Sequence, residues 1–300
     1  MEDLYDAIAR LKKERNAVIL AHVYQPEEIQ EIADFCGDSF GLSQEAARTD
    51  ADVIVFCGVR FMAETANILS PDKITLLPAP DATCRMFDDT LEARVKAVLA
   101  QHPEYKVVSY VNTPASVKAL SEICCTSSNA VKVVESLPKD QELLFVPDQD
   151  LASFTAEQTH ARIIPWQSAC PTHFNLTVEE VEAAKKAHPG ALVLMHPECR
   201  PQVRALADYV GSTTGIVKYA EQSDREEFII ATECGVLTQL AWKCPHKKFY
   251  MAGDMVCPNM KKTTLEKVKQ ALETLEPRVV VPEPIAEKAR VALERMLAVK

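Results

Sequence analysis

Three of the ten cysteines recur at nearly constant intervals along the chain. Cys84, Cys170 and Cys257 are separated by 86 and 87 residues. No two cysteines have the Cys-x-x-Cys spacing of zinc ribbons, thioredoxin motifs or ferredoxin-like motifs. Three thiolates brought together without a fourth would suit zinc with an open coordination position, or an iron–sulfur cluster in which one iron lacks a protein ligand. Cys199 is a candidate fourth ligand, although it lies outside this spacing.

Polar side chains at the ends of short apolar segments form a second repeated pattern. The first set directly follows these segments: His22, Tyr110 and His196. A second set stands two residues further on, on the same face of an extended chain: Tyr24, Asn112 and Glu198. A third set stands 17 residues after the first, where loops turn into helices: Ser39, Ser127 and Thr213. Such groups either serve locally as strand ends and helix caps or bind carboxylate and phosphate ligands together.

These spacings come from an internal repeat of about 87 residues. Each unit is predicted to contain three strands that alternate with two helices. Short apolar strands alternating with amphipathic helices indicate parallel sheets covered on both faces. We therefore expect an α/β protein of three homologous three-layer αβα domains around a pseudo-threefold axis. Ligands bind beyond the carboxyl ends of parallel strands, so such an axis would bring the polar sets together.

The repeat also predicts the domain boundaries. A Thr-x-Glu pattern that starts a helix begins at Thr90, Thr177 and Thr264, each 87 residues after the last. The first αβα domain is expected over residues 1–84, the second over 85–172 and the third over 173–263. The remaining stretch, 264–300, is expected to return and complete the first domain.

Composition and charge narrow the classes of function. The chain has 300 residues, 47% of them hydrophobic and 25% charged, which is typical of a globular protein with more than one core. Its formal net charge of −10 disfavours nucleic acid as a partner. Apolar stretches shorter than roughly 18 residues disfavour a membrane, and the charged N-terminal segment does not resemble a signal peptide. We expect a cytoplasmic protein whose cysteines are thiols.

The residues above lie in motifs that resemble those of the quinolinate synthase family of de novo NAD biosynthesis. The matching segments follow the family's order over nearly the whole chain: Ala21-His22-Val23-Tyr24-Gln25, Ala33-Asp34-Phe35-Cys36-Gly37-Asp38-Ser39, Ala82-Thr83-Cys84, Tyr110-Val111-Asn112, Cys125-Thr126-Ser127-Ser128-Asn129, Cys170-Pro171-Thr172-His173, His196-Pro197-Glu198-Cys199, Gly211-Ser212-Thr213 and Cys257-Pro258-Asn259-Met260-Lys261. Two features depart from the family's pattern. Val23 stands where the family has Asn, and Thr213 begins a Thr-Thr-Gly run.

The resemblance implies an activity and a cofactor. Enzymes of this family condense iminoaspartate with dihydroxyacetone phosphate to quinolinate, with loss of phosphate and two waters. They hold a [4Fe–4S] cluster by three cysteines, which correspond by position to Cys84, Cys170 and Cys257. The iron without a protein ligand acts as a Lewis acid. Direct supply of iminoaspartate by a partner enzyme is left open.

Candidate site residues follow from the motifs and the repeat. Proton transfer is assigned to Glu198, Tyr24 and His173, because a carboxyl, a phenol and an imidazole can each exchange a proton. Burial near anionic substrates is expected to raise the pKa of Glu198 towards the working range. The candidate substrate-binding residues are His22, Ser39, Tyr110, Val111, Asn112, Ser127, His196, Pro197, Glu198 and Thr213.

Three alternatives remain at this point. An open-iron cluster is also compatible with a hydro-lyase that dehydrates a small hydroxy acid without condensation. An iron–sulfur sensor protein is a second alternative, although the chain shows no basic or helix-turn-helix segment for nucleic acid. A zinc enzyme with three cysteine ligands is the third, and metal analysis would distinguish it.

Overall fold

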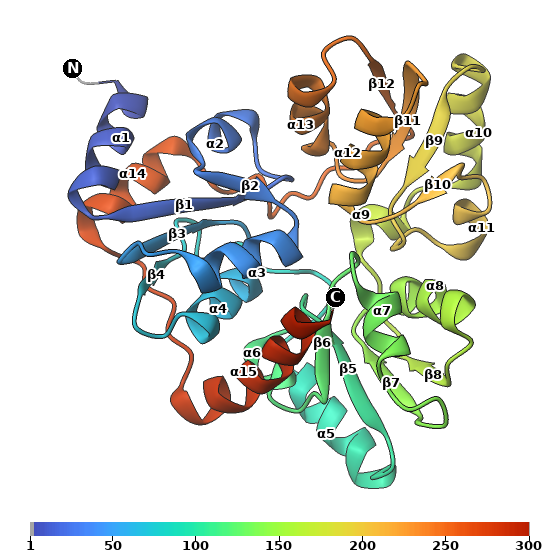
Figure 1. Ribbon diagram of the computed structural model, residues 1–300, viewed down its shortest axis with the longest axis horizontal. Helices are drawn as coiled ribbons and strands as arrows, with labels where there is room; N and C mark the ends of the chain where they lie inside the picture. Colours follow the sequence, from blue (N-terminus) through green and yellow to red (C-terminus); the bar gives the residue numbers. More distant parts are fainter. Residues whose placement is uncertain (1–2, 300) are drawn as a thin grey trace.

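The fold consists of three similar units arranged around a common centre, as Figure 1 shows. The computed structural model describes residues 3–299. Each unit contains one parallel four-stranded sheet, and the three sheets have the same strand order: β2-β1-β3-β4, β6-β5-β7-β8 and β10-β9-β11-β12. Helices flank each sheet. The prediction of three αβα domains with parallel sheets is confirmed.

The elements alternate along the chain as the repeat requires. The first unit contains α1 (Leu4–Glu14), β1 (Ala17–His22), α2 (Glu27–Ile32), β2 (Phe35–Gly37), α3 (Ser39–Arg48), β3 (Val53–Cys57), α4 (Arg60–Leu69) and β4 (Ile74–Leu76). The second contains α5 (Leu91–Gln101), β5 (Lys106–Tyr110), α6 (Ala115–Lys118), β6 (Ile123–Cys125), α7 (Ala130–Glu135), β7 (Leu143–Val146), α8 (Gln149–Thr159) and β8 (Ile163–Pro165). The third contains α9 (Pro171–Phe174), α10 (Val178–Ala187), β9 (Leu192–Met195), α11 (Pro201–Arg204), β10 (Tyr209–Val210), α12 (Thr213–Gln222), β11 (Glu227–Ala231), α13 (Val236–Lys243) and β12 (Lys248–Met251).

Each sheet has one strand more than the three predicted. The additional strands are β2, β6 and β10, which are only two or three residues long and lie at the sheet edge beside the first strand of their unit. Such short segments carry too few residues for a period-2 pattern, so the sequence did not separate them from the neighbouring helices. The hydroxyl residues of the third polar set stand two or three residues after the ends of these strands.

The C-terminal stretch divides between two units. Helix α14 (Leu265–Thr274) packs against α1 of the first unit. Helix α15 (Glu283–Ala298) packs against β6 and α6 of the second unit and against α4 of the first. The domain boundaries remain a prediction, and residues 1, 2 and 300 lie outside the described residues.

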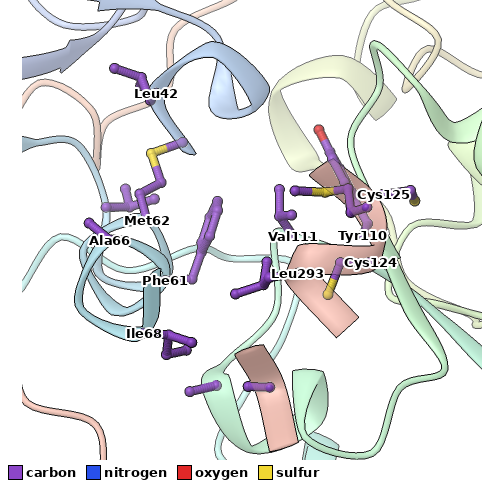
Figure 2. Close-up of a cluster of buried hydrophobic side chains, with 14 of the residues drawn as sticks. Leu42, Phe61, Met62, Ala66, Ile68, Tyr110, Val111, Cys124, Cys125 and Leu293 are labelled. Carbon is purple, nitrogen blue, oxygen red and sulfur yellow. The ribbon is translucent and has the colours of Figure 1, made fainter. Parts of the chain in front are cut away.

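The largest hydrophobic core joins the first two units. Figure 2 shows part of it, with Phe61 and Met62 of α4 on one side and Cys124 and Cys125 of β6 on the other. Leu293 of α15 lies between them and is completely buried. Strands such as β3 are buried along their whole length, as expected for a parallel sheet covered on both faces. The first two units therefore pack directly against each other.

No helix in the range 3–299 combines the length and the apolarity that a membrane crossing requires.

Candidate functional site

The carboxyl ends of the strands from all three units open into one cavity of about 190 Å³. His22 of β1, Tyr110 of β5 and His196 after β9 line it. The residues two positions further on line it as well: Tyr24, Asn112 and Glu198. The structure therefore brings the first two polar sets together at one cavity, as the repeat predicted.

The three hydroxyl residues Ser39, Ser127 and Thr213 also line the cavity, and neighbouring residues cap two of the three helices that follow. Asp38 accepts the N–H of Gly41 at the start of α3, at 3.0 Å. Ser212 accepts the N–H of Gly215 at the start of α12, at 3.1 Å. Helix α7 has no side-chain cap, so the hydroxyls of Ser39, Ser127 and Thr213 are not used for capping.

Two predicted substrate-binding residues do not line the cavity. Val111 is buried in the core between the first two units, and its N–H bonds to the carbonyl of Cys125 at 2.9 Å. Pro197 lies between two lining residues, and its carbonyl accepts a hydrogen bond from Arg204 at 3.2 Å. Both residues stand in the chain between two residues that line the cavity.

A continuous chain of hydrogen bonds crosses the site from the third unit to the first and back. The Thr213 hydroxyl lies 2.9 Å from the Tyr24 hydroxyl, which lies 2.8 Å from the Thr232 hydroxyl. Thr232 lies 2.9 Å from His173 Nε2, and His173 Nδ1 lies 2.7 Å from Glu198 Oε2. The Glu198 carboxylate can only accept, so Nδ1 of His173 donates to it. This chain connects all three predicted proton-transfer residues.

The pKa of Glu198 is shifted in the direction opposite to the prediction. Burial alone would raise it, but His196 and His173, together with hydrogen bonds from His173 and Tyr110, lower the pKa below its usual range. The sequence analysis assumed apolar surroundings and like charges. It missed the stacked rings of His173 and His196, whose centroids lie 4.6 Å apart next to the carboxylate. Glu198 is therefore ionised at neutral pH.

The imidazoles of His22 and His196 are neutral at neutral pH. Burial lowers the pKa of His22 to about 4 and that of His196 to about 3. Nδ1 of His22 accepts the N–H of Tyr24 at 3.1 Å, and Nδ1 of His196 accepts the N–H of Glu198 at 3.3 Å. Each ring therefore carries its proton on Nε2. In His196 this nitrogen lies 3.2 Å from the Ser127 hydroxyl.

Cys84, Cys170 and Cys257 line the same cavity, one from each predicted domain. All three are free and partly exposed. Burial raises the pKa of each thiol, to about 12 for Cys84. The nearby backbone N–H groups of Met86, His173 and Met260 oppose this shift in the pKa of Cys84, Cys170 and Cys257 respectively, and those of His173 and Met260 donate to the carbonyls of Cys170 and Cys257 at 3.1 Å. N–H groups near a sulfur stabilise its thiolate and favour metal-bound cysteines.

Two further observations concern a possible metal. The sulfur of Cys170, His173 and a Glu198 oxygen lie within 4.8 Å of one another, a grouping that could also hold a metal ion. Cys199 is completely buried and its sulfur faces the carbonyl of Ala231, 3.8 Å away. It is not among the lining residues, so the structure does not support it as a fourth ligand.

Several residues of the site were not predicted. Thr232 links Tyr24 to His173, and Glu233 lines the cavity and is completely buried. Asp148 is completely buried behind Cys170, whose N–H it accepts at 3.0 Å. The repeat contained a signal for two of them, because Asp148 and Glu233 both stand a few residues after the second apolar run of their unit.

A family model and the most similar curated proteins point to the same family. A family model described as "Quinolinate synthetase A protein" matches residues 6–298. The "Quinolinate synthase" of Methanoregula boonei is 51% identical over 296 residues, which cover 98% of this chain and 98% of that protein. The "Quinolinate synthase 1" of Methanosarcina acetivorans is 52% identical over 299 residues, covering 99% and 98%. The "Quinolinate synthase" of Geobacter metallireducens is 53% identical over 293 residues, covering 97% and 96%.

Proposed function

The chain belongs to the quinolinate synthase family, and we propose that it condenses iminoaspartate with dihydroxyacetone phosphate to quinolinate, releasing phosphate and two waters. The observation that carries the proposal is the single cavity into which three cysteines open beside the Glu198–His173 pair. A hydro-lyase and a sensor protein are not favoured, because the family match covers nearly the whole chain.

Cys84, Cys170 and Cys257 would hold a [4Fe–4S] cluster. Three free thiols on one cavity, each with a nearby backbone N–H group that lowers the pKa of the thiol, fit this group. When bound by three cysteines, such a cluster supplies one iron without a protein ligand, a Lewis acid that eases the loss of a hydroxyl group.

The neutral histidines and the hydroxyls would bind the anionic groups of the substrates. The Nε2–H groups of His22 and His196 and the hydroxyls of Ser127 and Thr213 are donors on the cavity wall. Asn112 contributes a side chain whose buried Oδ1 has no partner within residues 3–299. This oxygen is an acceptor for an amine or hydroxyl group of a substrate, so the cavity offers both donors and an acceptor.

Glu198 would accept and return protons during the condensation. It is ionised at neutral pH, which makes it a base in the free enzyme. His173 holds it at 2.7 Å and connects it through Thr232 to the Tyr24 hydroxyl. A proton taken up by Glu198 can therefore be shared with His173 without leaving the buried network.

The test is an anaerobic assay with purified protein. We expect quinolinate to form only when iminoaspartate and dihydroxyacetone phosphate are both present, with phosphate released in equal amount. Dehydration of a hydroxy acid without quinolinate would instead indicate the hydro-lyase.

We further propose a cytoplasmic location, in keeping with ten cysteines that form no disulfide. We also propose that a partner enzyme delivers iminoaspartate. The test compares quinolinate formation when iminoaspartate is produced by a separate enzyme in the same assay with its formation when free iminoaspartate is added.

A further inference from the structure

Two buried carboxylates occupy equivalent positions in the second and third units. The strand register defines the equivalence: Leu20 pairs with Phe56, Val108 with Phe145 and Leu194 with Ile230. Three residues beyond the second member of each pair stand Val59, Asp148 and Glu233. Asp148 and Glu233 are completely buried. A buried carboxylate is costly unless its oxygens are well satisfied, so its partners indicate what it is there to hold.

Asp148 joins the end of β7 to the loop that carries Cys170. Its Oδ1 accepts the N–H of Leu151 at 2.7 Å and caps α8. Its Oδ2 accepts the backbone N–H of Cys170 at 3.0 Å. The second bond is not needed for the cap. It fixes the backbone of a cysteine whose sulfur faces the cavity.

Glu233 makes the same connection in the third unit. Its Oε2 accepts the N–H of Gly235 at 2.7 Å, just after β11. Its Oε1 accepts the backbone N–H of Cys257 at 3.0 Å. Lys261 balances the charge, because its Nζ lies 2.9 Å from Oε1 and donates to the carbonyl of Tyr24 at 2.6 Å. As in Asp148, one carboxylate oxygen accepts an N–H from the residues that follow and the other accepts the N–H of a cysteine.

The first unit holds its cysteine loop differently. Val59 has no carboxylate, and the N–H of the next residue, Arg60, bonds to the carbonyl of Ala82 at 2.8 Å. Asn259 of the third unit adds a bond from its Nδ2 to the carbonyl of Thr83 at 2.6 Å. The loop of Cys84 is therefore held through carbonyls, and those of Cys170 and Cys257 through their own N–H groups.

We propose that Asp148 and Glu233 are positioning residues that fix two of the three cluster cysteines by accepting their backbone N–H groups. The inference rests on the proposed function, since it concerns the cysteines that would hold the cluster. Each carboxylate fixes the direction of one Cα–Cβ bond, and with it the place of the sulfur at the cavity. Neither residue lies in the hydrogen-bonded chain from Thr213 to Glu198, so their effect is on retention of the cluster.

The substitutions Asp148→Asn and Glu233→Gln test this role with little change in shape. A carboxylate accepts at both oxygens, whereas an amide accepts at one and donates at the other. Asn caps helices about as well as Asp, so Asp148→Asn keeps the cap on α8 and removes the acceptor for Cys170. Asp150→Asn is the matched control, because Asp150 is a buried carboxylate of α8 whose Oδ2 has no hydrogen-bond partner among residues 3–299.

The experiment measures iron loss to 2,2′-bipyridyl from anaerobically purified, cluster-bearing protein. We expect Asp148→Asn and Glu233→Gln to lose iron about tenfold faster than the wild type, the scale of one hydrogen bond to a charged acceptor. Asp150→Asn should match the wild type. Amide hydrogen exchange should rise only in the peptide containing Cys170 for Asp148→Asn, and only in the peptide containing Cys257 for Glu233→Gln. A general loss of stability would not produce this separation.

The outcomes distinguish this inference from the proposed function. Wild-type iron loss and wild-type exchange in both variants would overturn the positioning role and leave the function intact. Wild-type protein without iron or sulfide would overturn both. If one of the two variants fails to fold, the other decides, since each carboxylate serves a different cysteine.

Discussion

Replacing Glu198 by Gln removes the charge and the proton acceptor of the site while keeping the size of the side chain. In the wild type, Oε2 lies 2.7 Å from His173 Nδ1 and 3.7 Å from His196 Nδ1. The Gln side chain can keep the contact with His173 through its oxygen. It can no longer take up a proton, and it carries no negative charge. The variant should therefore fold and bind substrates but lose the proton step.

The expected magnitude has two parts. Loss of a positioned acid or base costs about 10²–10⁴-fold in turnover. Loss of a charge-assisted hydrogen bond, which here orients His173, costs a further factor of about ten. We expect turnover to fall by at least about a thousandfold, with a change in KM of less than about tenfold. Cluster content should stay at the wild-type level, because Cys84, Cys170 and Cys257 are unchanged.

The assay is anaerobic quinolinate formation, normalised to the iron and sulfide content of each preparation. Glu179→Gln is the control, since Glu179 is an exposed residue of α10. Wild-type turnover per cluster in Glu198→Gln would refute the role of Glu198 and leave His173 as the next candidate. An equal loss of turnover in Glu179→Gln would show that the loss comes from damage during purification and not from the change at Glu198.

Three other predictions follow from the same structure. Cys84→Ser, or the equivalent change at Cys170 or Cys257, should abolish the cluster, whereas Cys57→Ser should retain it; iron and sulfide analysis checks both, and a full cluster in any of the first three would contradict the assignment. Thr213→Val should weaken quinolinate binding by about tenfold in equilibrium titrations, because it removes a hydroxyl donor on the cavity wall; unchanged affinity would leave Thr213 a structural residue. Burial lowers the pKa of Lys118 to about 8 from 10.5, so the folded protein disfavours the charged form. This cost is fully present below pH 8 and is relieved as the pH rises to 10.5. Between pH 8 and pH 10.5 the free energy of unfolding of the wild type should therefore rise by about 3 kcal/mol relative to that of Lys118→Met, as measured by urea denaturation at each pH. A difference between the two proteins that does not change with pH would contradict this prediction.

The repeat made the main features of the site predictable. A spacing of about 87 residues places Cys84, Cys170 and Cys257 at equivalent positions, and parallel sheets place equivalent strand ends together. The same reasoning brought His22 and Glu198 to one cavity. These predictions needed only the order of the elements and the direction of the strands.

Features that depend on side-chain contacts between units were not predictable in the same way. The pKa of Glu198 is lowered because His196 and His173, which is part of α9, lie against it. No local pattern shows the contact with His173. The course of α15, which packs on the second unit as well as the first, depends on a shared core that forms only when the units are assembled. Thr232 is a single hydroxyl at the end of a strand, and its role is visible only from Tyr24 and His173 on either side.

Mössbauer spectroscopy of the iron-enriched, anaerobically purified protein, before and after addition of quinolinate, tests the central claim most directly. Three cysteine ligands on one cavity predict a [4Fe–4S] spectrum in which a single iron changes its isomer shift when quinolinate is added, and the others do not. A cluster in which every iron is unaffected by quinolinate, or a protein that contains zinc in place of iron, would contradict the account.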